Sequence, residues 1–189
     1  MSDFHDPKNS LSLFELKDKL NFFIKLYDLN KLPKVIMLSG KKGIGKFTLI
    51  NHLLVYMHDK NNYNLNTMSI NSETSFYKQY LNNTFPNIIY LSGSNFKNIK
   101  IEDIRILKSN ILKTTISGKE RFIILDDIEL FNKNSLNALL KLLEEPPSKN
   151  FFILINNNTK PLIQTIYSRS LEIKVFLSNF SRISIIKSL

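Results

Sequence analysis

Residues 122–147 read FIILDDIELFNKNSLNALLKLLEEPP, and this stretch decides the fold class. Its first four residues form a short apolar run that is typical of a buried strand, and Asp126 and Asp127 follow directly. The leucines of 132–143 recur at helical spacing, and Pro146 ends this helix because proline cannot continue one. A buried strand, an acid pair and an amphipathic helix in this order indicate an α/β protein.

The rest of the chain repeats the alternation of strands and helices. Helices are expected at 10–28, 46–58, 72–82, 101–113 and 132–143, with a helical turn at 161–167. Strands are expected at 35–39, 87–91, 122–125, 151–155 and 171–176, and the Asn-rich residues 59–67 are predicted to form a loop. This order predicts a parallel sheet flanked by helices on both faces. We place this domain at 1–177, and 178–189 begins a new helical pattern that we assign to a second domain.

Composition excludes several classes of protein. The chain has 189 residues, 43% of them hydrophobic, which suits one globular domain with a core. No apolar run reaches the roughly 18 residues of a membrane span, and the polar N-terminus is no signal peptide, so we expect a cytoplasmic protein without membrane contact. The chain has no cysteine, and His5, His52 and His58 are scattered, so we expect no zinc and no other metal cluster.

The formal net charge is +10, and nearly all of the basic residues are lysines. One interpretation is an Asn/Ile/Lys-rich composition with a solvated lysine surface. The other is a diffuse positive field that favours nucleic acid or an acidic partner. No basic cluster interleaved with aromatic residues supports sequence-specific binding, so charge alone does not decide between the two.

A glycine loop, GKKGIGK at 40–46, follows the first predicted strand and opens a helix, which is the context of a phosphate-binding loop. Such a loop points backbone amides at phosphate oxygens, and the candidate nucleotide-binding residues are Gly40, Gly43, Ile44, Gly45, Lys46, Phe47 and Thr48. Lys46 would bridge the terminal phosphates. A Ser or Thr should follow it to hold Mg²⁺, but Phe47 stands there and Thr48 lies about 100° further round the helix. ATP/Mg²⁺ binding is therefore expected to be weak or lost, and a simple glycine turn is the alternative.

The acid pair forms the second half of the candidate nucleotide site. In nucleotide hydrolases built this way, the first acid reaches Mg²⁺ through water and the next, usually Glu, polarises the attacking water. Asp126 fits the first position, whereas Asp127 is one methylene shorter than Glu and forms a degenerate catalytic base. The alternative is a pair of acids at the exposed end of a strand.

Four segments carry a resemblance to a known family: GKKGIGK, FIILDDIE, NSLNALLKLLEEPP and FILINNNTKPLIQTIYSRS. Together they resemble the AAA+ module of bacterial DNA polymerase III clamp loaders, from about residue 10 to 176. Gamma/tau subunits usually carry an intact lysine–Ser/Thr pair and an Asp–Glu pair, so the chain is most similar to delta prime subunits. The resemblance implies an AAA+ P-loop-type fold and makes 178–189 the start of a helical lid.

The same resemblance assigns roles to residues near the end of the chain. It makes Arg169, in the segment Ser168–Ser170, an arginine finger that acts in trans at a neighbour's ATP site. A guanidinium suits this role because it is permanently charged and offers a planar fork of donors. We expect an exposed loop arginine, with a surface ion pair as the alternative. Asn156 and Asn157 match the sensor-1 position of the family, or they simply cap a strand.

The implied function is that of a delta prime subunit, part of a DNA polymerase complex and without ATPase activity of its own. It would brace the ATP-driven ring that loads the sliding clamp during DNA replication. The implied partners are gamma/tau and delta subunits in a hetero-oligomeric ring, with the sliding clamp and primer–template DNA reached through the complex. The alternatives are an ATP-hydrolysing gamma/tau-type subunit and another DNA-associated AAA+ ATPase.

Overall fold

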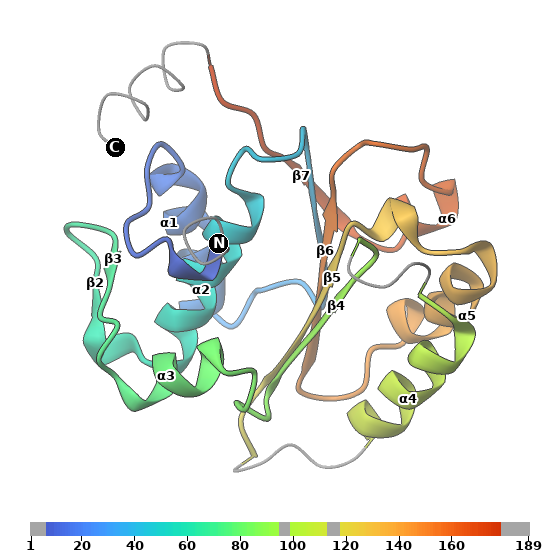
Figure 1. Ribbon diagram of the computed structural model, residues 1–189, viewed down its shortest axis with the longest axis horizontal. Coiled ribbons are helices and arrows are strands. Elements are labelled where there is room, and N and C mark those ends of the chain that lie inside the picture. The colour runs from blue at the N-terminus through green and yellow to red at the C-terminus, as the bar shows by residue number, and fades with distance from the viewer. Residues whose placement is uncertain (1–6, 95–98, 113–117, 179–189) are drawn as a thin grey trace. The chain divides into compact units, whose positions relative to one another are not determined.

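The computed structural model describes residues 7–94, 99–112 and 118–178 (Figure 1). The chain divides into two compact units. Within the described part, unit 1 contains residues 7–32, 43–85 and 176–178, and unit 2 contains 33–42 and the described residues of 86–175.

Unit 2 is built on a five-stranded sheet in which all neighbouring strands are parallel. Its strands are β1 (Val35–Ser39), β4 (Ile88–Ser92), β5 (Arg121–Asp126), β6 (Asn150–Asn156) and β7 (Leu171–Lys174). Their order in the sheet is β4-β5-β6-β1-β7. All five strands were predicted, and the parallel α/β sheet is confirmed.

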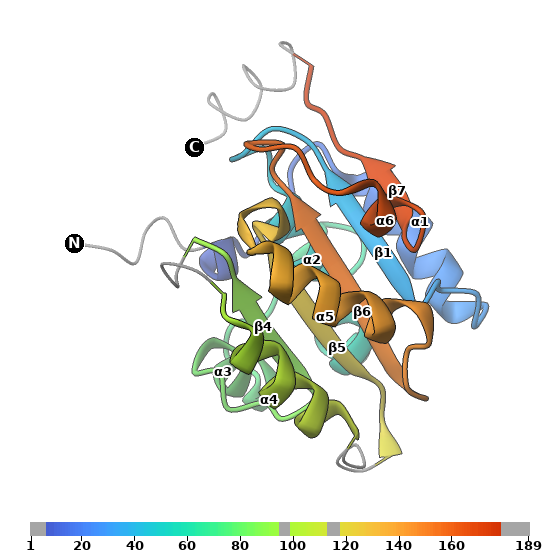
Figure 2. The same ribbon diagram turned by 90° about the vertical axis from the view of Figure 1, so that its right-hand side faces the viewer.

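Unit 2 also contains the helices α4 (Ile101–Leu112), α5 (Lys133–Glu144) and α6 (Gln164–Tyr167). Figure 2 shows α4 and α5 lying across β4, β5 and β6. The core of the unit includes Val35, Met37, Ile104, Leu107, Ile123, Leu125, Leu139, Leu143, Phe152, Leu154 and Ile166. Strand residues of the opposite parity, such as Ile36, Ile124 and Ile153, are buried as well. Burial of both parities is what a parallel sheet covered on both faces requires.

Helix α5 begins and ends where its sequence signals place it. The Asn132 side chain accepts a hydrogen bond from the Ser135 N–H (2.8 Å), which satisfies a donor of the first turn. Its amide Nδ2 donates to the Ile99 carbonyl (2.6 Å) and so ties the helix start to the segment before α4. The helix ends at Glu144, before the two prolines.

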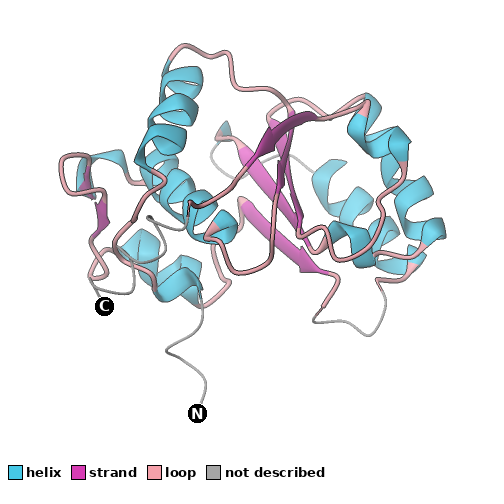
Figure 3. Ribbon diagram, turned by 90° about the horizontal axis from the view of Figure 1, so that it is seen from above, coloured by secondary structure: helices cyan, strands magenta, loops and turns pink. Residues whose placement is uncertain are grey.

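Unit 1 is mainly helical (Figure 3). It contains α1 (Lys17–Asp28), α2 (Lys46–His58), α3 (Ser75–Leu81) and the short turns η2 (Pro7–Asn9) and η3 (Lys60–Asn62). It also contains an antiparallel hairpin of β2 (Tyr63–Asn64) and β3 (Ser69–Ile70). The helix predicted over 46–58 is confirmed at both ends.

Two predictions in unit 1 were wrong. The helix expected from residue 10 starts at Lys17, because the preceding segment is extended and pairs with the hairpin. The Leu13 N–H donates to the Met68 carbonyl (3.0 Å), and the Ile70 N–H donates to the Leu11 carbonyl (2.9 Å). The Asn-rich loop also contains β2: the Asn64 side chain accepts from two following backbone N–H groups and so turns the chain back.

No helix in the described part of the chain is long and apolar enough to cross a membrane. The predicted start of a lid at 178–189 lies, apart from Ser178, outside the described residues. The division into a domain at 1–177 and a following lid therefore stays a prediction.

Candidate functional site

The glycine loop leaves β1 and enters α2 as predicted. Gly43 and Gly45 have φ angles of 82° and 86°, in the left-handed region that other residues rarely adopt. Gly45 is the N-cap of α2, and its carbonyl accepts the Leu49 N–H at 2.9 Å. The loop runs through both units, since Gly40 belongs to unit 2 and the two other glycines belong to unit 1.

The side chains of the loop differ from those of a magnesium–nucleotide site. Lys46 is buried, with 3% of its surface exposed, and Ile44 is buried too. Phe47 and Thr48 are partly buried. Phe47 carries no oxygen, so the position after the lysine offers a metal no ligand.

Within unit 2, Asp127 and Asn157 lie together at the carboxyl edge of the sheet. Asn157 Nδ2 donates to Asp127 Oδ1 at 2.6 Å, and Lys42 Nζ lies 3.5 Å from the same oxygen. The Asp127 side chain is only 3% exposed. The alternative of acids at an exposed strand end is therefore wrong for Asp127.

Asp126 has protein partners on both of its oxygens. The Tyr90 hydroxyl donates to Oδ2 (3.0 Å), and the Asp127 N–H donates to Oδ1 (2.8 Å). Burial, followed by the charge of Asp127, raises the pKa of the Asp126 carboxyl. Tyr90 was not predicted, and its one signal in the sequence is a tyrosine within an otherwise apolar strand.

The pKa of Asp127 moves in the opposite direction. Burial alone would raise it, but hydrogen bonds from Ser94 and Asn157, together with the Lys42 charge, outweigh burial and lower the pKa. The two carboxyls therefore differ in proton affinity, with the proton favoured on Asp126 and the negative charge on Asp127.

The two asparagines predicted as sensor candidates do different things. Asn156 Oδ1 accepts the Asn158 N–H (2.9 Å), and its Nδ2 donates to the Tyr167 hydroxyl (3.1 Å), so its side chain caps the strand. Its carbonyl accepts the Gly40 N–H (3.1 Å), which brings the start of the glycine loop to the same edge. Only Asn157 directs its side chain to the acid pair.

Glu129 also stabilises the carboxyl edge of the sheet, and it was not predicted. It lies in η5 (Ile128–Leu130) and is 5% exposed. Its Oε1 accepts the Asn157 N–H (3.1 Å), the Thr159 hydroxyl (2.8 Å) and the Thr159 N–H (3.3 Å). Glu129 thus fixes the loop that carries Asn157. Its one signal was the third acid in DDIE, which does not distinguish a buried carboxylate from a surface one.

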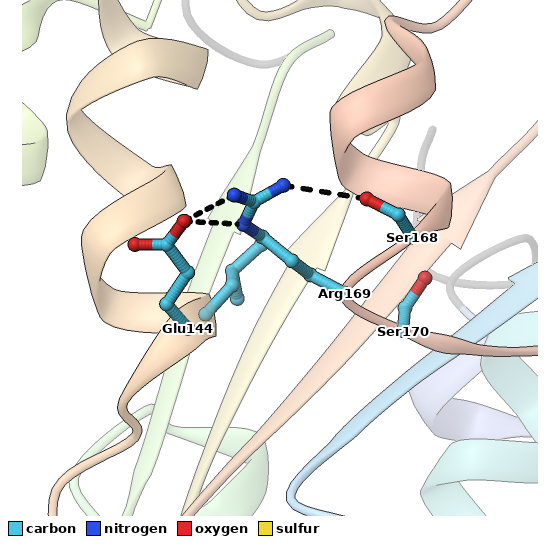
Figure 4. Close-up of a pocket in the computed structure, with 5 residues that line it drawn as sticks. Glu144, Ser168, Arg169 and Ser170 are labelled. Atoms are coloured by element: carbon cyan, nitrogen blue, oxygen red, sulfur yellow. Dashed lines mark hydrogen bonds and ion pairs between the residues drawn. The ribbon is translucent and has the colours of Figure 1, made fainter.

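Arg169 lies at the other end of the sheet. It precedes β7, whose first residue pairs with Ile36 near the start of β1, whereas Asp126 is the last residue of β5. Its Nε donates to Glu144 Oε1 (2.9 Å) and its Nη2 contacts the same oxygen (Figure 4). Only 26% of the side chain is exposed. The expectation of an exposed loop arginine is therefore wrong, because α5 supplies a carboxylate that holds it.

A hollow of about 510 Å³ lies beside this ion pair. It is lined by Leu143, Glu144, Ser168, Arg169 and Ser170 (Figure 4). Among the described residues, no three His, Asp or Glu side chains gather closely enough to hold a metal ion.

Comparison with known proteins decides the family. Residues 16–178 match the family model described as DNA polymerase III, delta subunit. The chain belongs to this family of clamp-loader AAA+ proteins. It is 31% identical over 155 residues to DNA polymerase III subunit delta' of Buchnera aphidicola subsp. Schizaphis graminum, covering 77% of this chain and 44% of the relative.

Subunits of other types are similar as well. The chain is 27% identical to DNA polymerase III subunit gamma of Buchnera aphidicola subsp. Acyrthosiphon pisum, covering 78% of this chain and 39% of the relative. The chain therefore spans less than half the length of these curated relatives.

Solved structures show the fold. A DNA polymerase III gamma subunit-related protein of Thermotoga maritima matches with a TM-score of 0.55 at 19% identity, covering 87% of this chain and 49% of that one. The RuvB Holliday junction branch migration motor of the same organism matches with a TM-score of 0.56 at 18% identity, covering 96% and 53%. These similarities confirm the predicted AAA+ fold.

Proposed function

We propose that this chain acts as a delta prime-type subunit of a clamp loader. In this proposal it braces the ATP-driven ring that loads the sliding clamp during replication, and it lends Arg169 to the ATP site of a neighbour. Its partners are gamma/tau and delta subunits in the cytoplasm, with the sliding clamp and primer–template DNA reached through the complex. The family match and the relatives named delta' support this proposal.

One observation carries the proposal: Arg169 and the chain's own acid pair occupy opposite edges of the sheet in unit 2. This arrangement supports a role for Arg169 at the nucleotide of another subunit rather than beside Asp126 and Asp127. A guanidinium is suited to such a contact because its planar fork of donors matches phosphate oxygens.

The test is Arg169→Ala in a complex assembled from the full-length protein and gamma-type ATPase subunits. A finger acting alone contributes roughly 10³–10⁵ in rate, and the loss observed in a ring with several ATP sites is smaller because one site is served. We expect slower ATP hydrolysis with assembly retained. Arg105→Ala is the matched control, since Arg105 is 70% exposed and pairs only loosely with Glu102 (3.7 Å).

Arg169→Lys separates charge from geometry. An ammonium keeps the charge but loses the fork, so we expect poor rescue. Unchanged ATPase and clamp-loading rates in a fully assembled Arg169→Ala complex would contradict the proposal. The role of Arg169 would then be limited to its ion pair with Glu144.

We also propose that the chain's own site binds ATP/Mg²⁺ weakly or not at all. The residues present fit such a site poorly, because Phe47 offers no metal ligand and both Asp126 oxygens accept hydrogen bonds from the protein. A gamma-type subunit is the second candidate, which the 27% identical gamma relative favours. Measured ATP turnover by the isolated chain distinguishes the two.

A further inference from the structure

Two sequence motifs that lie far apart in the chain form one ion pair. Glu144 is the last residue of α5, within the segment LLEEPP, and Arg169 lies in the segment SRS. In the sequence these segments are separate motifs of the family resemblance, and nothing there indicates a role for Glu144. In the structure, Glu144 is the carboxylate that contacts the arginine.

The guanidinium is held from two sides. On one side, Nε and Nη2 both contact Glu144 Oε1. On the other, Nη1 donates to the carbonyl of Thr165 in α6 (2.9 Å) and to Oγ of Ser168, the C-cap of α6 (3.3 Å). Figure 4 shows the contact with Ser168. A planar group held along two of its edges is fixed in direction and in rotation.

The hollow beside the pair leaves the arginine accessible to an anion. Ser168 Oγ donates to the Thr165 carbonyl (3.1 Å) and Ser170 Oγ donates to the Ile166 carbonyl (3.0 Å), so both hydroxyl protons of the lining are committed. Four of the five N–H groups of Arg169 donate to Glu144, Thr165 and Ser168, so the second N–H of Nη2 is the donor that this lining can offer to a phosphate oxygen. Glu144 holds it without enclosing it, since the glutamate side chain is 47% exposed.

We infer that Glu144 is the positioning residue of Arg169, fixing the guanidinium in the orientation from which it reaches a neighbour's phosphate. This inference rests on the proposed trans-acting role of Arg169. A free arginine side chain samples many rotamers, and a group that is oriented before the reaction avoids that entropic cost in the transition state. Both partners remain partly open to solvent, with 26% of Arg169 and 47% of Glu144 exposed, so the pair adds little to folding stability and its function is orientation.

The experiment is Glu144→Gln in the fully assembled complex. Glutamine keeps the size and one acceptor oxygen but removes the charge that strengthens the contact. Because small misplacement of a catalytic group costs up to about 10²-fold, we expect the kcat at the one ATP site that Arg169 serves to fall roughly tenfold or more, with KM nearly unchanged. In the whole ring this loss is diluted by the other sites and does not exceed that of Arg169→Ala. Glu145→Gln is the matched control: it removes the same charge one residue further along, from an exposed side chain, and should leave the rates unchanged.

Glu144→Asp keeps the charge on a side chain one methylene shorter and should lose less activity than Glu144→Gln. A double variant gives the sharpest result: with Arg169→Ala already present, Glu144→Gln should cause no further loss. Melting temperatures of all variants check that folding is retained.

The outcomes separate this inference from the proposed function. If Arg169→Ala has no effect, the proposed function fails and the inference fails with it. If Arg169→Ala slows hydrolysis but Glu144→Gln behaves like the wild type or faster, the positioning role alone is overturned. An equal loss from Glu144→Gln with and without Arg169 also overturns it, since Glu144 would then act on something else.

Discussion

Phe47 is the residue on which the chemistry of the glycine loop depends. The loop keeps its strand–turn–helix backbone, with Gly45 as the N-cap of α2 and Lys46 as its first residue. The hydroxyl that would hold Mg²⁺ is missing at the next position, and an aromatic ring stands there. Backbone amides at a helix N-terminus attract phosphate in any sequence, whereas the metal needs one particular side chain.

The first prediction is that the isolated chain hydrolyses little or no ATP. Phe47→Thr should tighten Mg²⁺-dependent ATP binding, measured by calorimetry with and without Mg²⁺. Thr48→Ala is the control and should change little, because Thr48 points about 100° away round the helix. Turnover near ~1 s⁻¹ that disappears in Lys46→Ala would contradict the prediction and favour a gamma-type ATPase. No gain from Phe47→Thr would indicate that the loop cannot admit a nucleotide.

The type and spacing of the site residues could be predicted from the sequence, but the contacts of their side chains could not. The spacing from Gly40 to Phe47 predicted a phosphate loop without its hydroxyl, and the backbone agrees. Glu144 carried no signal and the signals of Tyr90 and Glu129 did not reveal their roles, because each residue acts through a partner 25 or more residues away. Hydrogen bonds of that reach depend on the sheet order, which a single sequence does not contain.

At the scale of elements, the strands of unit 2 were predicted well and the start of unit 1 was not. Apolar runs bounded by polar residues fit buried parallel strands, and their short length distinguishes them from buried helices. Leu13 and Leu16 have a spacing that fits a helix, yet Leu13 lies in an extended segment and Leu16 is the N-cap of α1. Both side chains are buried. Pairing with β3 overrode the local pattern, and β3, which is two residues long and follows the Asn-rich loop, was not predicted.

His52 of α2 ties this extended N-terminal segment to the hairpin. Its Nε2 lies 3.0 Å from the Ser10 carbonyl, so this nitrogen carries the proton, and its Nδ1 lies 2.8 Å from the Tyr63 hydroxyl, which donates to it. The ring is fully buried. Burial lowers the pKa of His52 to about 4, only partly opposed by the Ser10 carbonyl.

The second prediction is that His52 makes unit 1 sensitive to acid. The unfolded chain binds a proton near the ordinary pKa of 6.5, whereas folded His52 resists protonation down to about pH 4. Between these values the unfolded state binds more protons, so the free energy of unfolding falls as the pH falls, by up to roughly 3 kcal/mol. Urea unfolding of wild type and His52→Gln from pH 7.5 to 4 measures this. Carboxylates titrate in both proteins, so only the difference between the two reports on His52. An equal dependence of the free energy of unfolding on pH in both proteins would refute the role of His52.

At the scale of the whole molecule, the chain combines an AAA+ fold with a net charge of +10. Its relatives are subunits of DNA polymerase III, and it spans less than half of their length. Fold class and family followed from motifs spread over most of the chain. Three of them contain or follow the strands β1, β5 and β6 of one sheet, and the fourth forms α5. The meaning of the positive charge did not follow, because net charge reports neither where a partner binds nor which one.

The last prediction concerns DNA. With lysine-rich charge and no aromatic–basic cluster, we expect the chain to contact backbone phosphates and to read no bases. Binding that neutralises about three phosphates weakens roughly 40-fold between 50 and 200 mM salt. Fluorescence anisotropy with two duplexes of equal length and unrelated sequence, across this salt range, measures both properties. Equal affinities that fall together with salt would support contact through phosphates. A preference for one sequence that survives 200 mM salt would instead favour a DNA-reading AAA+ protein, because base contacts lose little affinity to counterions.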